Sequence, residues 1–272
     1  MRHIPRKRGH IPRKRFGQHF LHDPYVLSRI VQAIAPQPND AIVEIGPGEG
    51  ALTRPLLERT PRLVAIEIDR DLAAALASEF SPERLQVIVA DALEFDFASL
   101  PEGLRVVGNL PYNVSTPLLF HLAGFASRVR DMHFMLQLEV VERMAASHST
   151  PEYGRLSVML QRRFRIERLF KVPAGAFRPP PKVESAIVRL TPLPADQLAP
   201  VDEALFASVV TRAFGARRKT LRNALGSLIG AAELERLGID PGLRPENVSP
   251  GDYIRIAIAI SSRAASQLDP QQ

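Results

Sequence analysis

The tetrapeptide Asn109-Leu110-Pro111-Tyr112 brings together groups suited to holding a flat base that carries an exocyclic amine. The Asn109 side-chain oxygen and the Leu110 backbone carbonyl can each accept a hydrogen bond from such an amine. Pro111 has no backbone donor and its ring restricts φ, which stiffens the turn. Tyr112 offers an aromatic face for stacking. The same residues also suit a plain strand-to-helix turn, so the tetrapeptide alone leaves both interpretations open.

The neighbouring residues indicate where in a fold this tetrapeptide lies. The run at 105–108 predicts a buried strand before it, and Pro117 predicts the start of a helix after it. We therefore expect the tetrapeptide at the carboxyl end of a parallel strand, which is where open α/β sheets bind their ligands.

A glycine-rich turn follows an earlier predicted strand, at 41–45. In Gly46-Pro47-Gly48-Glu49-Gly50 the glycines allow a ligand to approach the backbone at a helix N-terminus. The spacing fits neither the G-x-x-x-x-G-K-[ST] phosphate loop nor the dinucleotide pattern G-x-G-x-x-G. Glycines that merely make a tight turn therefore remain an alternative.

Acidic side chains close the next two predicted strands. Glu67, in the strand at 63–69, lies about 20 residues beyond the glycine turn and can accept hydrogen bonds from both hydroxyls of a ribose. Asp91 follows the strand at 85–90. It can accept the amine of a bound adenine or cap the following segment, and both interpretations stay open.

Strands and helices alternate from residue 41 to residue 146, which predicts a doubly wound α/β sheet. Further strands are expected at 132–137, 164–172 and 185–190. Four strand ends carry candidate ligand groups, and this coincidence is more specific than any single motif. These groups are Gly46 with Gly48, Glu67, Asp91 and Asn109.

Composition divides the chain into a basic arm at 1–15, a main domain at 16–194 and a helical domain at 195–272. The arm contains seven Lys and Arg residues and no acid, so it accounts for the whole net charge of +6. Its sequence His3–Arg8 is repeated at His10–Arg15. A proline-rich stretch at 191–200 predicts a linker, and the periodic runs beyond it are all helical.

Two basic clusters are candidates for contacting nucleic-acid phosphates. One closes the arm, and the other is expected within about two turns of a helix at 217–228. A disordered tail and a solvated helix face are the respective alternatives. The residues concerned are Arg13, Lys14 and Arg15 in the arm, and Arg217, Arg218, Lys219 and Arg222 in the helical domain.

Composition also excludes several classes of protein. The 272 residues contain no Cys, so disulfides, thiolate metal sites and a Cys nucleophile are absent, and no metal is predicted. No apolar stretch is long enough to cross a bilayer, and no signal-peptide core follows Met1. We therefore expect a cytoplasmic protein without a membrane partner. Separately from these observations, we expect a monomer.

Six ordered motifs resemble the ribosomal RNA adenine dimethyltransferases of the KsgA/RsmA family. The resemblance covers nearly the whole chain from Arg13 onward. It implies a Rossmann-like S-adenosylmethionine-dependent methyltransferase sheet at 16–194 and a small all-helical C-terminal domain. The motifs are Arg15-Phe-Gly-Gln-His-Phe-Leu21, Glu44-Ile-Gly-Pro-Gly48, Asn109-Leu-Pro-Tyr112, Tyr153-Gly-Arg-Leu-Ser157, Phe177-Arg-Pro-Pro-Pro-Lys-Val183 and Arg217-Arg-Lys-Thr-Leu-Arg-Asn223.

The resemblance also implies an activity and a site. The implied reaction is dimethylation of two adjacent adenosines near the 3′ end of 16S ribosomal RNA in the small (30S) subunit, with a role in ribosome biogenesis. The family usually has Asn where this chain has His19. The implied cofactor-binding residues are Gln18, His19, Leu21, Gly46, Gly48, Glu67, Asp91, Ala92 and Asn109. Those implied for the target base are Asn109, Leu110, Pro111, Tyr112 and Phe177, with Phe177 as plain core the alternative.

Two rival functions stay open at this point. One is the related enzyme that dimethylates a single adenine in large-subunit RNA and gives macrolide resistance. The motifs at Phe177–Val183 and Arg217–Asn223 favour the small-subunit enzyme by resemblance. The other rival is a non-catalytic RNA-binding factor for small-subunit assembly. The presence of Glu67, Asp91 and Asn109 argues for catalysis.

Overall fold

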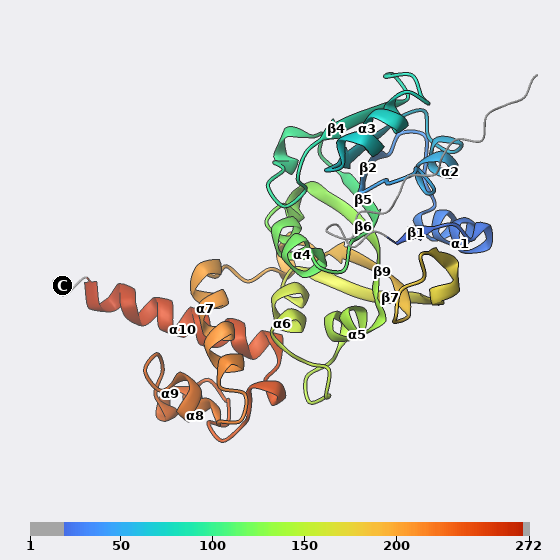
Figure 1. Ribbon diagram of the computed structural model, residues 1–272. Coiled ribbons are helices and arrows are strands. Elements are labelled where there is room, and N and C mark those ends of the chain that lie inside the picture. The colour runs from blue at the N-terminus through green and yellow to red at the C-terminus, as the bar shows by residue number, and fades with distance from the viewer. Residues whose placement is uncertain (1–18, 269–272) are drawn as a thin grey trace, which may run out of the picture. The chain divides into compact units, whose positions relative to one another are not determined.

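The structure is a computed structural model that describes residues 19–268, with side chains up to residue 263 (Figure 1). The chain forms two compact units, each described here by itself. The first contains the chain up to Leu138 together with Leu169–Arg189. The second contains Glu139–Arg168 and the chain from Leu190 onward.

A seven-stranded sheet has the strand order β4-β3-β2-β5-β6-β9-β7 (Figure 1). The first five strands in this order are parallel to one another. Strands β2 and β5 are almost wholly buried, as in sheets that are covered on both faces, and this confirms the predicted α/β class. The strands are β2 (Ala41–Ile45), β3 (Leu63–Glu67), β4 (Leu85–Val89), β5 (Leu104–Asn109), β6 (Val129–Gln137), β7 (Phe164–Val172) and β9 (Ser185–Pro192).

Carboxylate caps define the starts of two helices of the first unit. The Asp23 carboxylate accepts the amides of Tyr25 and Val26 at the start of α1 (Pro24–Ile34). Asp69 caps α3 (Arg70–Ala77) in the same way. The remaining helices of this unit are α2 (Thr53–Leu57) and α4 (Ser115–Ala123).

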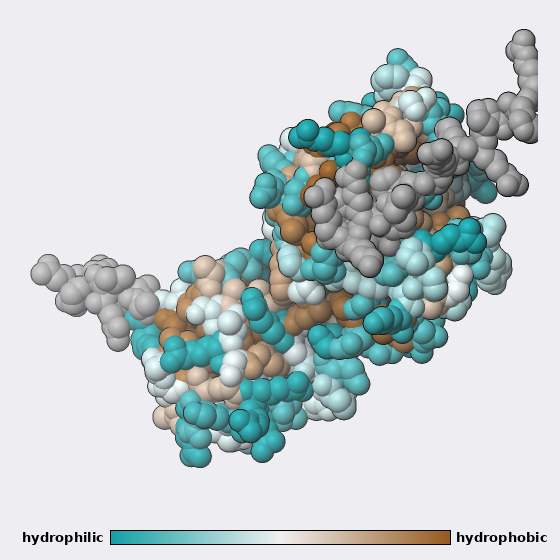
Figure 2. All heavy atoms as spheres, in the orientation of Figure 1, coloured by the Kyte–Doolittle hydropathy of each residue, from teal (hydrophilic) through white to brown (hydrophobic). Residues whose placement is uncertain are grey.

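The second unit is built from helices around its own apolar core. The Tyr153 and Tyr253 rings are buried in it, and each hydroxyl donates to a backbone carbonyl. Hydrophilic residues gather over α8 and α9 on the face drawn in Figure 2. No helix within residues 19–268 is long and apolar enough to span a membrane. The helices are α6 (Arg155–Gln161), α7 (Glu203–Gly215), α8 (Leu221–Leu225), α9 (Ala231–Arg236) and α10 (Pro250–Leu268), and α5 (Leu138–Ala145) starts at the unit boundary.

Two parts of the structure differ from the sequence-based expectation. The helix predicted at 217–228 spans only Leu221–Leu225, because α7 ends at Gly215 and Thr220 has an extended backbone. Strand β1 (Phe20–Leu21) showed no periodicity, yet it pairs antiparallel with β8 (Phe177–Arg178). Strands of two residues are too short to produce a readable pattern.

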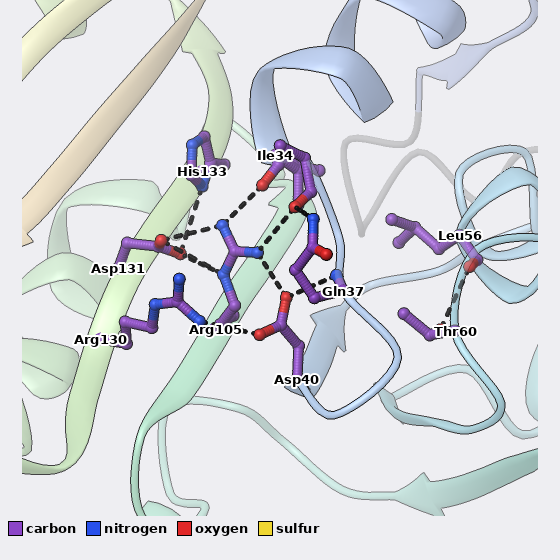
Figure 3. Close-up of polar contacts among 10 residues, drawn as sticks. Ile34, Gln37, Asp40, Leu56, Thr60, Arg105, Arg130, Asp131 and His133 are labelled. Carbon is purple, nitrogen blue, oxygen red and sulfur yellow. Dashed lines mark hydrogen bonds and ion pairs between the residues drawn. The ribbon is translucent and has the colours of Figure 1, made fainter.

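An ion network lies at the end of β5 opposite to Asn109 (Figure 3). The Arg105 guanidinium is 5% exposed and donates to Asp40 Oδ2 at 2.6 Å and to Asp131 Oδ1 at 3.0 Å. It also donates to the Ile34 carbonyl at the end of α1, at 2.6 Å. Arg105 therefore ties α1 and the turn after it to strands β5 and β6.

Gly108 allows β5 and β2 to approach closely, just before the tetrapeptide. A Cβ atom at this position would lie 2.5 Å from the Ile45 carbonyl oxygen. We expect Gly108→Ala to force the strands apart and to lower the free energy of unfolding by about 1–3 kcal/mol, measured by urea denaturation. Gly175→Ala is the control, because a Cβ there meets nothing within 4 Å. An unchanged urea midpoint for Gly108→Ala would contradict this account.

Candidate active site

A pocket in the first unit is lined by most of the predicted ligand groups. The strand ends bring them together from segments that are far apart in the sequence. Those that line it are His19, Leu21, Gly46, Gly48, Glu67, Asp91, Ala92, Asn109, Leu110, Pro111 and Tyr112. Gln18 lies outside the described residues. A pocket therefore lies at the carboxyl ends of the parallel strands, where this topology places ligands.

The glycine turn after β2 has the backbone conformation that only glycine adopts without strain. Gly46 has φ +65° and Gly48 has φ +56°. A Cβ atom at Gly48 would lie 3.1 Å from the Phe20 ring, which also lines the pocket. The turn therefore presents bare backbone to the cavity at Gly46 and Gly48, while Pro47 and Glu49 also line it.

The two predicted acids each use backbone amides to fix their carboxylates. Glu67 accepts from the amides of Gly48 at 3.1 Å and Asp69 at 2.9 Å, one on each oxygen. Burial raises the pKa of Glu67, and these amides oppose that shift. Asp91 Oδ1 accepts from the Leu93 amide at 2.9 Å. Because a carboxylate oxygen has two lone pairs, both groups retain acceptor capacity toward the pocket.

Asn109 is held by a bond to the N-terminal segment. Its Nδ2 donates to the His19 carbonyl at 2.9 Å, which fixes the plane of the amide. Oδ1 lies on the other side of that amide group and keeps its role as an acceptor. The Leu110 amide donates to the Met135 carbonyl at 3.2 Å, so the tetrapeptide is anchored to β6 as well.

Tyr112 presents the aromatic ring that the sequence predicted at the pocket. Its hydroxyl lies 2.7 Å from Ser185 Oγ, and burial raises the pKa of the phenol, which stays neutral. The ring stacks on the imidazole of His19, with centroids 5.7 Å apart and an interplanar angle of 29°. The His19 Nδ1 lies 2.8 Å from the Pro179 carbonyl oxygen.

Phe177 does not line the pocket. It is 2% exposed, belongs to the apolar core of the first unit and lies opposite Leu21 in the β1–β8 pair. The structure therefore places Phe177 in the core, which was the alternative interpretation of this residue. Its visible role is to support β1, which carries Phe20 over the glycine turn.

Glu44 is a pocket residue that the sequence analysis did not single out. It is 2% exposed within β2, lines the cavity and accepts a hydrogen bond from Thr53 Oγ1 at 2.6 Å. Burial raises the pKa of this carboxyl to about 7. The signal was available, because an acid within the apolar run 41–45 has to be accommodated inside the fold.

The raised pKa of Glu44 predicts a pH dependence of stability. Between about pH 4.5 and pH 7 the folded protein keeps a proton on this group that the unfolded chain has lost. Stability therefore falls as the pH rises through this window, and Glu67 adds a shift of the same sign. We expect Glu44→Gln to flatten the dependence, measured by urea unfolding at several pH values. An identical slope in the variant would contradict the assignment.

The predicted RNA-contacting residues of the helical domain are all exposed. Arg217, Arg218 and Lys219 lie in the turn between α7 and α8, and Arg222 lies on α8. Arg217 donates to the Pro151 carbonyl at 3.2 Å. Arg13, Lys14 and Arg15 lie outside the described residues. Within residues 19–268 no cluster of His, Asp or Glu could hold a metal ion.

Comparison with known proteins shows which family the chain as a whole resembles. The family described as "Ribosomal RNA adenine dimethylase" matches residues 9–262. "Ribosomal RNA small subunit methyltransferase A" of Thiobacillus denitrificans is 60% identical over 254 residues, 93% of this chain and all of that protein. The protein of the same name from Aromatoleum aromaticum is 60% identical over 259 residues, 95% of this chain and 98% of that protein.

Solved structures show the same fold. A dimethyladenosine transferase from Plasmodium falciparum aligns with a TM-score of 0.78 and 24% identity, covering 90% of this chain and 98% of that one. The 23S rRNA methyltransferase ErmE aligns with a TM-score of 0.70 and 28% identity, covering 89% and 99%.

Proposed function

This chain belongs to the ribosomal RNA adenine dimethylase family and is an S-adenosylmethionine-dependent enzyme, and we propose that its pocket binds the cofactor and the target adenine together. The observation that carries this proposal is the convergence of the glycine turn, Glu67, Asp91 and Asn109 on one cavity. A cofactor with a ribose, an adenine and a methionine end requires those separate groups, and a single nucleotide-binding motif would not supply them.

The cofactor-binding roles follow from the acceptors at each strand end. The Glu67 carboxylate accepts hydrogen bonds from the ribose hydroxyls, and Asp91 accepts one from the adenine amine. Ile68, which is 46% exposed and lines the pocket, supplies an apolar surface beside the ring, next to Ala92. The side-chain-free turn at Gly46 and Gly48 allows the cofactor to lie against the backbone. Leu21 and the backbone at His19 border the methionine end.

The target adenine is held by the tetrapeptide. The Asn109 Oδ1 and the Leu110 carbonyl accept the two amine hydrogens and so favour a pyramidal nitrogen, whose lone pair is less delocalised into the ring. Pro111 stiffens the turn that presents these acceptors. Tyr112 stacks on the base, while Phe177 supports β1 from the core. When bound, S-adenosylmethionine would supply the methyl group to the amine nitrogen, and Asn109 Oδ1 and the Leu110 carbonyl would hold that nitrogen in place until its proton is lost to water.

Positioning and electrostatics carry most of the rate in this scheme. The tetrapeptide contains no strong general base, and none is required because the amine nitrogen becomes positively charged on methylation and then loses its proton readily. A second methylation needs room for the first methyl group. The monomethylated amine also has only one hydrogen to donate to the two acceptors. Asn109 and Leu110 therefore contribute most to the first transfer.

The substrate that we propose is the small ribosomal subunit, with two adjacent adenosines of its 16S RNA as targets. The relatives at 60% identity are named for the small subunit, whereas the 23S enzyme is 28% identical. We further propose that the enzyme acts as a cytoplasmic monomer during ribosome biogenesis. In this proposal Arg217, Arg218, Lys219 and Arg222, with Arg13, Lys14 and Arg15 of the arm, contact RNA phosphates.

Methyl transfer from labelled S-adenosylmethionine tests this proposal. The acceptors are small subunits and large-subunit RNA, both from cells that lack the modification, and product nucleosides are identified by mass spectrometry. We expect N6,N6-dimethyladenosine in small-subunit RNA only. Label in large-subunit RNA would move the substrate to that of the resistance enzymes. Cofactor binding without label in either RNA would favour a non-catalytic assembly factor.

A further inference from the structure

The imidazole of His19 is the second aromatic ring at the base-binding end of the pocket. Phe177, the second ring expected from resemblance, is buried in the core and does not line the cavity. His19 is only partly buried, lines the cavity and stacks on Tyr112, with ring centroids 5.7 Å apart. The imidazole of His19 therefore faces Tyr112, whereas the cofactor-binding role proposed for this segment uses Leu21 and the backbone at His19.

Three contacts hold His19 at this position. The Nδ1 lies 2.8 Å from the Pro179 carbonyl oxygen, and the His19 carbonyl accepts from Asn109 Nδ2 at 2.9 Å. The next residue, Phe20, pairs with Arg178 in the β1–β8 sheet. The backbone around His19 is thus fixed by Asn109 and by the β1–β8 pair, whereas the imidazole is held by one hydrogen bond and by stacking.

We propose that the target adenine inserts between the rings of Tyr112 and His19, so that His19 binds the base by stacking. This inference rests on the proposed function and adds a base-binding residue to it. A flat base with a ring on either side needs roughly 7 Å between the two ring planes, about 3.5 Å for each contact. The centroids are 5.7 Å apart and the rings are tilted by 29°. Because the separation of the ring planes cannot exceed the centroid distance, the imidazole has to move away from Tyr112 by at least about 1 Å to admit the base.

A second stacking partner has a clear energetic purpose. Extruding a base from RNA has an unfavourable free energy that one aromatic contact offsets only in part. Each base–aromatic contact strengthens binding by roughly 5- to 150-fold. Without the base, stacking of His19 on Tyr112 keeps both rings partly covered, and the base then replaces ring–ring contact by two contacts of its own.

Two substitutions separate the ring from its hydrogen bond. His19→Gln removes the ring but can still donate to the Pro179 carbonyl, and His19→Phe keeps a ring but has no donor. In methyl transfer to undermethylated small subunits, we expect His19→Gln to lower kcat/KM by roughly 5- to 150-fold. His19→Phe should recover most of that loss. The Kd for S-adenosylmethionine, measured by calorimetry, should stay within about twofold in both variants, which also verifies that they fold.

A binding measurement keeps the test independent of methyl transfer. A short RNA with 2-aminopurine at an unpaired position cannot be methylated at the 6-amino group, and its fluorescence is quenched when the base stacks. Wild type and His19→Phe should quench it, and His19→Gln should quench it less.

Three results would overturn the inference. They are wild-type kcat/KM and quenching in His19→Gln, equal impairment of both variants, and weakened cofactor binding in both. Impairment of His19→Phe alone would assign the role to the Pro179 hydrogen bond, which His19→Gln can still make. Transfer by neither wild type nor variants, with the quenching pattern intact, would refute the proposed function and leave the stacking supported.

Discussion

Asn109→Ala is expected to lower turnover by about 10²–10³-fold, the usual effect of removing one preorganised group that stabilises a transition state. The substitution removes the Oδ1 acceptor from the target amine and the Nδ2 bond that holds the His19 carbonyl. Cofactor binding should stay within a few fold, because Glu67, Asp91 and the glycine turn are unchanged. Turnover is measured with labelled cofactor on small subunits, and cofactor binding by calorimetry.

A matched control is available on the same unit. Asn39 is an exposed turn residue that does not line the pocket, so Asn39→Ala should retain wild-type turnover and cofactor affinity. A near-wild-type rate for Asn109→Ala would refute the catalytic assignment. Loss of rate and of cofactor binding together would instead indicate that Asn109 serves the cofactor.

Arg105→Ala is expected to lower the free energy of unfolding by about 3–5 kcal/mol, as removal of one partner from a buried ion network does. It leaves Asp40 and Asp131 buried without the guanidinium that they share (Figure 3). Arg130→Ala is the control. Arg130 also pairs with Asp40, at 2.8 Å, but its side chain is 59% exposed, so the loss should stay under about 1 kcal/mol. Urea denaturation at pH 7 measures both values.

The loss in Arg105→Ala should depend on pH. Burial acts to raise the pKa values of Asp40 and Asp131, but their hydrogen bonds and the charge of Arg105 outweigh burial and hold both values low. Without Arg105 both pKa values rise, so the folded variant binds protons that the unfolded chain has released. The deficit should therefore shrink as the pH is lowered from 7 toward 4. A deficit that is independent of pH would contradict the electrostatic explanation.

The pocket could be predicted from the sequence because its parts obey local rules. Buried parallel strands are apolar runs, and their carboxyl ends fall at one edge of the sheet, so Gly46, Glu67, Asp91 and Asn109 could be assigned to the same edge. Helix caps such as Asp23 and Asp69 obey an equally local rule, since a capping side chain bonds to amides two or three residues away. The strand–helix alternation then predicted the fold class.

The contacts that the sequence did not reveal join residues far apart along the chain. Arg105 was part of a run that predicted a buried strand, but nothing local indicates that Asp40 and Asp131 neutralise it. The pairing of Phe20 with Arg178 rests on two-residue strands, and the stacking of His19 on Tyr112 depends on that pairing. Phe177 is equally ambiguous, because an aromatic residue beside a proline run suits a surface clamp or the core.

A crystal structure of the protein with a cofactor analogue and adenosine tests the central claim most directly. The account predicts the analogue along Gly46, Glu67 and Asp91, and the adenosine amine within hydrogen-bond distance of Asn109 Oδ1 and the Leu110 carbonyl. The base should stack on Tyr112, with its amine facing the position of the transferable methyl group. An adenine bound elsewhere, or bound at this site with its amine turned away from Asn109, would contradict the account.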